Sequence, residues 1–186
     1  TKQEEMGLNI RQETDRDNRE VCSVVKTAFA TAEHCDGTEQ DLVEALRRGS
    51  AFVPELSLVA EEGGKIIGHI LFTKASVGSQ TVLALAPLSV LPEYQRKGVG
   101  SALVTEGHRI ARTLGFFYSV VLGSETYYPR FGYVPSVRLG ILPPFEVPAE
   151  NFMALRLRED APPVSGVLNY PKEFGIERLE NDEFLG

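Results

Sequence analysis

Residues 85–114 read LAPLSVLPEYQRKGVGSALVTEGHRIARTL, and they join a buried strand to a helix through a basic turn that contains two glycines. Ahead of the turn, a nearly continuous apolar run is typical of a strand covered on both faces. Its members are Val82, Leu83, Leu85, Leu88, Val90 and Leu91. Beyond the turn, apolar residues recur at helical spacing, at Val99, Leu103, Ile110 and Leu114. The helix is therefore expected to begin near Gly98.

The turn between this strand and this helix has the composition of an anion site. The first amides of an α-helix have no carbonyl partner within the helix, and the helix dipole adds partial positive charge there. Gly98 and Gly100 carry no Cβ that would hold a ligand away from the backbone, and Arg96 and Lys97 add two full charges. The expected guest is a phosphate or a pyrophosphate.

Three glycine-containing motifs could explain such a turn. A P-loop needs a lysine after its glycines, whereas Lys97 precedes both. The dinucleotide-binding fingerprint fits only in part, because Leu103 occupies its third glycine position and Tyr118 stands where an acidic residue is expected. The third pattern, Gln/Arg-x-x-Gly-x-Gly/Ala, is matched in full by residues 95–100. This segment resembles motif A of the GNAT superfamily of acetyl-CoA-dependent N-acetyltransferases.

Composition narrows the class of protein. A chain of 186 residues with 42% hydrophobic residues suits one domain over 1–186 with a sizeable core. No apolar run is long enough to span a membrane and no signal peptide opens the sequence, so we expect a cytoplasmic protein. The net charge of −7 argues against nucleic acid and favours a cationic substrate. Cys22 and Cys35 lack partners at metal-binding spacing, so reduced thiols and no metal are expected.

Hydrophobic periodicity predicts the other elements. We expect strands over 8–12, 56–60, 65–74, 117–122, 134–141 and 152–158, helices over 15–30 and 39–48, and a short helical segment over 125–131. Asp15 is the expected N-cap of the first helix. Pro87 lacks an N–H and should interrupt the ladder near residues 86–90. The tail from Asp160 is expected to pack loosely or to lie on the surface.

A second segment strengthens the resemblance. Residues 127–133, Tyr-Tyr-Pro-Arg-Phe-Gly-Tyr, are similar to the Tyr-x-x-x-Gly-Phe signature of GNAT enzymes, with Tyr133 in place of the usual Phe. Together with residues 147–155 they resemble the YhbS-like branch of predicted acetyltransferases. The resemblance covers residues 8–158, with 159–186 as an extension. It implies an α/β (α+β) fold with a mixed sheet of about seven strands and about four helices, the strands over 82–91 and 117–122 splaying apart at the cofactor site.

The resemblance also implies the chemistry. Acetyl-CoA would donate its acetyl group to an amine by direct attack in a ternary complex, with an oxyanion and a thiolate to stabilise. The backbone N–H of Val90 would donate a hydrogen bond to the oxyanion, and Tyr128 would protonate the thiolate or hydrogen-bond to it. The implied cofactor contacts are Leu88, Val90, Gln95, Arg96, Lys97, Gly98, Val99, Gly100, Ser101, Ser124, Tyr127, Tyr128 and Arg130. Ser124 stands near the position of an asparagine that many members use, and Tyr127 could exchange roles with Tyr128.

Several points stay open at this level. Residues that could accept the proton of the amine are Glu33, His34, Asp36, Glu61, Glu62 and His69, but His69 is better explained as a hydrogen-bonded core histidine, and a water relay would serve equally. The acceptor is either a small-molecule or a protein amine, and a homodimer is left open. A non-catalytic acyl-CoA-binding sensor or interaction module is the alternative function.

Overall fold

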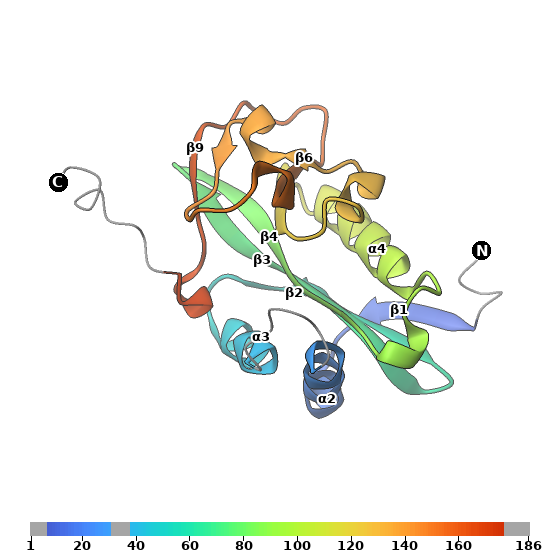
Figure 1. Ribbon diagram of the computed structural model, residues 1–186. Helices are drawn as coiled ribbons and strands as arrows, with labels where there is room; N and C mark the ends of the chain where they lie inside the picture. The colour runs from blue at the N-terminus through green and yellow to red at the C-terminus, as the bar shows by residue number, and fades with distance from the viewer. Residues whose placement is uncertain (1–6, 31–37, 177–186) are drawn as a thin grey trace. The chain divides into compact units, whose positions relative to one another are not determined.

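The computed structural model describes residues 7–30 and 38–176, which fall into two compact units that alternate along the chain (Figure 1). The first unit comprises Thr1–Thr73 and Leu85–Leu114, and the second comprises Lys74–Ala84 and Gly115–Gly186. Two strands, β3 (Lys65–Val77) and β4 (Gln80–Val90), contribute residues to both units. The units therefore are not consecutive segments of sequence, and a single domain over 1–186 stays a prediction.

The strands of the first unit follow one another in the order β1-β2-β3-β4. β1 spans Leu8–Gln12 and β2 spans Phe52–Glu62, and both pairs β1–β2 and β2–β3 are antiparallel. Gly63 and Gly64, with φ of 57° and 80°, make the tight turn from β2 to β3. Both positions need the left-handed conformation that glycine adopts without strain. The predicted hairpin is confirmed, with strands longer than expected.

Helices cover both faces of this antiparallel layer (Figure 1). α2 (Asn18–Phe29) and α3 (Glu39–Arg48) lie on one face, and α4 (Val99–Thr113) lies on the other. α4 approaches β3 closely because two glycines make room. A Cβ on Gly107 would lie 2.3 Å from Cε2 of Phe72, and a Cβ on Gly68 would lie 3.1 Å from Cδ1 of Leu103. The predicted α3 and α4 are confirmed within a residue.

The start of α2 differs from the expectation. A 3-10 helix, Asp15–Asp17, precedes the α-helix, so Asp15 is not its N-cap. The carboxylate of Asp17 accepts hydrogen bonds from the N–H of Thr14 at 2.7 Å and from Arg11 at 2.7 and 2.9 Å. These bonds lower the pKa of Asp17, with Arg11 as the main cause. A side chain from β1 thus fixes where the helix begins, which local sequence cannot reveal.

The second unit has two parallel strand pairs and several antiparallel ones. β5 (Tyr118–Leu122) pairs parallel with β4 through Leu83↔Ser119 and Ala84↔Val120. β8 (Phe152–Arg156) pairs antiparallel with β5 and with β6 (Val134–Pro135), while β9 (Gly166–Asn169) pairs with β3 and with β7 (Ile141–Leu142). The core of this unit includes the buried side chains of Val82, Tyr118, Ile141, Phe152 and Leu168.

Three expectations fail in the second unit and its surroundings. The single strand over 134–141 is wrong, because a 3-10 helix, Ser136–Leu139, separates β6 from β7. The loosely packed tail is wrong for its described part: Val164 and Leu168 are buried, and the Tyr118 hydroxyl donates to the carbonyl of Pro162 at 2.8 Å. The described residues hold three α-helices rather than about four, since the segment over 125–131 is only a 3-10 helix, Tyr128–Phe131.

Candidate functional site

The turn before α4 leaves the first amides of that helix open. Gly98 occupies the N-cap position with φ of 86°, in the left-handed region, and no side chain caps the helix. The first turn holds no acidic residue, and the amides of Val99, Gly100 and Ser101 have no acceptor within the helix. A Cβ on Gly98 would meet no atom within 4 Å, so the space beside the turn is open. Dipole and amides together favour a bound anion there.

Two exposed cations flank this helix start. Arg96 and Lys97 make no ion pair with a carboxylate of residues 7–30 or 38–176. Arg96 has φ of 62°, an uncommon conformation for a residue with a side chain. Strained backbone of this kind is often found at functional sites, where surrounding contacts hold it. Both charges are therefore available to an anion at the head of α4.

The end of β4 presents amides at a strand edge. The N–H of Leu91 donates to the carbonyl of Ile67 on β3 at 2.9 Å. Because peptide groups alternate along an extended strand, the N–H groups of Val90 and Leu88 point to the opposite edge of β4. The side-chain amide Nε2 of Gln95 donates to the carbonyl of Val90 at 3.0 Å and so ties the turn to the strand. An N–H at Val90 can therefore be offered to an oxyanion.

In the second unit, Tyr128 combines a packed ring with an open hydroxyl. Its ring makes edge contacts with Tyr127 and Tyr133, and a Cβ on Gly123 would lie 2.4 Å from its Cε2. Burial, and then the neighbouring Tyr127, raise the pKa of Tyr128 well above its usual range. The part of the chain that the structure describes offers its hydroxyl no hydrogen-bond partner. Tyr128 is thus a protonated donor without an internal acceptor.

The neighbours of Tyr128 are used in local packing. The Tyr127 ring contacts Phe131 and lies 4.7 Å from the guanidinium carbon of Arg130, so Tyr127 and Arg130 stabilise each other. Ser124 accepts from the N–H of Thr126 and exchanges a hydrogen bond with its hydroxyl at 2.8 Å. The Ser124 hydroxyl is therefore engaged within its own turn. Tyr127 and Tyr128 have different surroundings: the Tyr127 ring packs against Phe131 and Arg130, whereas the Tyr128 ring packs against Gly123 and Tyr133.

The sequence-predicted site residues form two groups, one in each unit. Leu88, Val90, Gln95, Arg96, Lys97, Gly98, Val99, Gly100 and Ser101 belong to the first unit, where the β4 end and the α4 turn bring them together. Ser124, Tyr127, Tyr128 and Arg130 belong to the second unit, where the turn after β5 brings them together. Both groups follow directly on strands that the sequence predicts.

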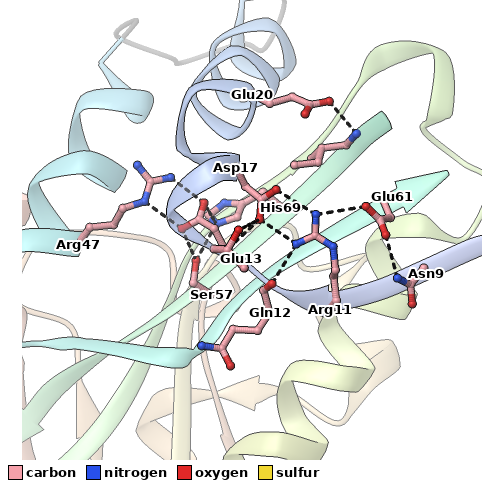
Figure 2. A network of polar contacts seen from close by, with 12 residues as sticks. Asn9, Arg11, Gln12, Glu13, Asp17, Glu20, Arg47, Ser57, Glu61 and His69 are labelled. Carbon is pink, nitrogen blue, oxygen red and sulfur yellow. Dashed lines mark hydrogen bonds and ion pairs between the residues drawn. The ribbon is translucent and has the colours of Figure 1, made fainter. Parts of the chain in front are cut away.

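A buried polar network that the sequence did not predict lies in the first unit (Figure 2). Arg47 on α3 donates to both carboxylate oxygens of Glu13, at 2.9 and 2.7 Å. The hydroxyl of Ser57 donates to Glu13 at 3.1 Å, so its oxygen accepts from Nε2–H of His69 at 3.0 Å. The only sequence signal is the alternation of Asn9, Arg11 and Glu13 on one face of β1 and its continuation.

This network makes His69 a neutral core residue, as expected. Its side chain is fully buried, and burial, followed by the charge of Arg47, lowers its pKa to about 3. Two of the carboxylates considered as bases, Glu61 and Glu62, lie at the end of β2. Glu61 accepts bonds from Asn9 and Arg11, which lower its pKa, and Glu62 closes the β2–β3 turn. Glu33, His34 and Asp36 lie outside the described residues.

The described residues contain neither a metal-binding cluster nor a membrane-spanning helix. No group of three His, Cys, Asp or Glu side chains that could hold a metal ion occurs within residues 7–30 and 38–176. Cys22 is a half-buried free thiol, whereas Cys35 lies outside the described residues. None of the described helices has the length and apolar character needed to cross a membrane.

Comparison with known proteins identifies the family. The model of the acetyltransferase (GNAT) family matches residues 23–133, more than half of the chain. The chain belongs to this family. The match contains the β4 end, the α4 turn and the Tyr128 segment, and it stops before the tail. This GNAT chain is 42% identical over 118 residues to YjhQ of Escherichia coli K12, an uncharacterized N-acetyltransferase, covering 61% of this chain and 65% of YjhQ.

Solved structures of GNAT proteins are similar over nearly the whole chain. A GNAT family acetyltransferase from Brucella melitensis, in complex with acetyl-CoA, is 32% identical with a TM-score of 0.76, covering 91% of this chain and 99% of that one. YhbS from Escherichia coli, in complex with CoA, is 26% identical with a TM-score of 0.83, covering 92% and 93%. The GNAT fold and the enzyme class expected from the sequence are confirmed.

Proposed function

We propose that this GNAT protein transfers the acetyl group of acetyl-CoA to a primary amine, as an acyltransferase of class EC 2.3.1.-. The observation that carries the proposal is the uncapped start of α4, where Gly98 leaves the amides of residues 99–101 open to a diphosphate. Arg96 and Lys97, which have no ion pair within residues 7–30 and 38–176, lie beside these amides. Membership of the GNAT family and the acetyl-CoA and CoA complexes of similar proteins support it. Acetyl-CoA supplies the activated thioester, and the chain supplies binding and polarisation.

The first unit would hold the cofactor by its backbone. Gln95 and residues 96–101 would surround the diphosphate, the amides by hydrogen bonds and Arg96 and Lys97 by charge. Leu88 and Val90, whose N–H groups face away from β3, would contact the pantetheine arm and the thioester oxygen. A backbone donor fixed in a strand requires no reorganisation when negative charge develops on that oxygen.

In the second unit, we assign to Tyr128 the role of stabilising the departing thiolate of CoA. A phenol of pKa near 10 facing a thiol near 8.5 already makes full proton transfer uphill by about 2 kcal/mol. Burial raises the pKa of Tyr128 further, which makes full transfer still less favourable. A hydrogen bond from the protonated hydroxyl to the departing sulfur is therefore the better role. Ser124, Tyr127 and Arg130 are proposed as further cofactor contacts around the same turn.

The free energy of proton transfer excludes His69 as the general base. An alkylammonium of pKa about 10.4 would have to protonate an imidazole whose pKa is lowered to about 3, which is uphill by about 10 kcal/mol. We assign no side chain as base. The acceptor is a cationic amine, small or protein-borne, as the net charge of −7 favours. The cytoplasmic location and the homodimer stay predictions.

Release of free thiol tests the proposal. Purified protein with acetyl-CoA and a panel of polyamines, amino acids, aminoglycosides and lysine peptides should release CoA with at least one amine. Tyr128→Phe should slow this release, and Tyr127→Phe, which keeps a ring against Phe131 and Arg130, should slow it less. Binding of acetyl-CoA without release for any amine would instead favour an acyl-CoA sensor, and no binding at all would refute both functions.

A further inference from the structure

A cationic cluster lies around Tyr94, in the turn between β4 and α4. The Nζ atoms of Lys65 and Lys97 each lie 5.8 Å from the centroid of the Tyr94 ring. Tyr94 ends the 3-10 helix Pro92–Tyr94 and is half-buried, while both lysines are exposed. Lys65 is the first residue of β3, so chain folding brings it to a turn nearly thirty residues away. We call these three residues the Tyr94 cluster.

Among the described residues, no carboxylate pairs with the charges of this cluster. Neither Lys65 nor Lys97 forms an ion pair with any carboxylate in the described part of the chain. By contrast, Arg11 pairs with Asp17, and Arg47 pairs with Glu13. Two ammonium groups at one ring repel each other, and the attraction of an exposed ring is weak. In a chain of net charge −7, such a cluster is best explained by an anion that binds there.

The position of Lys97 relates this anion to the helix start. Lys97 directly precedes Gly98, the N-cap of α4, whose open amides are assigned to the diphosphate under the proposed function. In CoA the 5′-diphosphate and the 3′-phosphomonoester are attached to the same ribose. A ligand held by its diphosphate at α4 therefore carries a second, doubly charged phosphate a few bonds away.

We propose that the Tyr94 cluster binds the 3′-phosphate of CoA, and so selects CoA and its thioesters over ligands that lack this group. This inference rests on the proposed function but adds a specificity that the helix start cannot supply. The amides of α4 would bind any diphosphate. Lys65 and Lys97 would supply charge-assisted hydrogen bonds to the phosphomonoester, while Tyr94 holds the two lysine chains beside each other.

Calorimetry with two ligands tests the inference without any turnover. The ratio of the dissociation constants of 3′-dephospho-CoA and CoA should be at least about tenfold for the wild type, as two charge-assisted contacts allow. Lys65→Ala should lower this ratio about threefold or more by weakening CoA alone. Lys97→Ala should also lower it, by weakening CoA more than 3′-dephospho-CoA, because Lys97 also faces the diphosphate that both ligands carry. The ratio should fall with added salt. Lys26→Ala, an exposed lysine on α2, is the matched control and should leave it unchanged.

Equal affinity of the wild type for both ligands would overturn the inference, as would lysine variants that weaken both ligands equally. Tight binding of both ligands would still leave the proposed function standing. Binding of neither ligand by the wild type would refute the proposed function itself, so the two failures are distinguishable. A thermal-shift measurement on each variant without ligand shows whether the fold is retained.

Discussion

Two polar regions of the first unit differ in how their charges are satisfied. Around Glu13, the carboxylate, the Arg47 guanidinium, the Ser57 hydroxyl and Nε2 of His69 bond to one another inside the protein (Figure 2). At the head of α4, the amides and cations have no such partners in the described residues. The polar groups of the Glu13 network bond to one another, so this closed region contributes to the stability of the fold. The amides and cations of the α4 turn form an open region, because they are available to a ligand. Changes in the two regions should therefore affect different quantities.

The largest effect is expected from opening the closed network. Glu13→Gln leaves the Arg47 guanidinium without its counter-charge, and both side chains are nearly buried, with 4% and 13% of their surface exposed. Removing one partner of a buried pair costs about 3–5 kcal/mol of unfolding free energy. Chemical denaturation should show this loss. Glu44→Gln removes the exposed pair with Arg48 and should cost less than about 1 kcal/mol.

For the same variant, the affinity for CoA should stay near that of the wild type under conditions where it is folded. A loss of CoA affinity as large as the loss of stability would show that the two regions are coupled. The distinction between a closed and an open region would then fail.

The next effect comes from filling the open turn with a charge. Gly98→Asp would place a carboxylate at the N-cap of α4, where it competes with the diphosphate, and CoA should bind at least about a hundredfold more weakly, about 3 kcal/mol. Gly98→Asn is the matched control, because Asn also tolerates the left-handed conformation but carries no charge. Titration calorimetry compares them. Equal affinities for the two variants would argue against an anion at this turn.

A comparable effect is expected on turnover rather than on binding. Tyr128→Phe removes the open hydroxyl while keeping the ring that fits against Gly123 and Tyr133. The turnover number should fall about a hundredfold, as for loss of a donor to developing charge, with CoA affinity and thermal stability unchanged. Steady-state kinetics with the best acceptor amine provides the measurement. Full turnover of this variant would remove Tyr128 from the mechanism.

The smallest effect per residue is the loss of stability that each buried histidine causes at low pH. Burial lowers the pKa of His69 to about 3 and that of His108 to about 4, below the value near 6.5 of an unfolded chain. The unfolded state therefore gains protons first, and stability is lost as the pH falls from about 6.5 toward these values. At pH 5 each histidine should cost about 2 kcal/mol of unfolding free energy.

Urea denaturation at pH 7 and pH 5 measures this loss. His69→Gln can still donate to Ser57 but does not titrate, so its loss between the two pH values should be about half that of the wild type. An unchanged pH dependence in this variant would show that His69 does not stay neutral in the folded protein.

Much of this fold could be predicted because the signals are local. The apolar runs and glycines of residues 85–114 define β4 and α4, and Gly49 ends α3 where the periodicity ends. The tail could not be predicted in this way. β9 has only four residues, and it exists because Ser76 and Val77 of β3 pair with its end. Such long-range pairing leaves no periodic trace in the sequence.

The site shows the same limit. The anion turn is one continuous segment, so its residues could be named from the sequence alone. The Glu13 network draws single polar residues from β2, β3, α3 and the end of β1, each of which resembles a solvated residue in its local setting. Lys65 likewise gave no sign of its contact with Tyr94, because a lysine after a glycine turn is ordinary in a hairpin.

The central claim is that the open amides of α4 hold the diphosphate of CoA. An NMR titration of amide resonances with CoA tests it most directly, because it observes the open and the closed region in one experiment. We expect the largest shifts at Gly98, Val99, Gly100 and Ser101, and only small shifts at Glu13 and Ser57. Saturable CoA binding that leaves the amides of residues 98–101 unshifted would contradict the account.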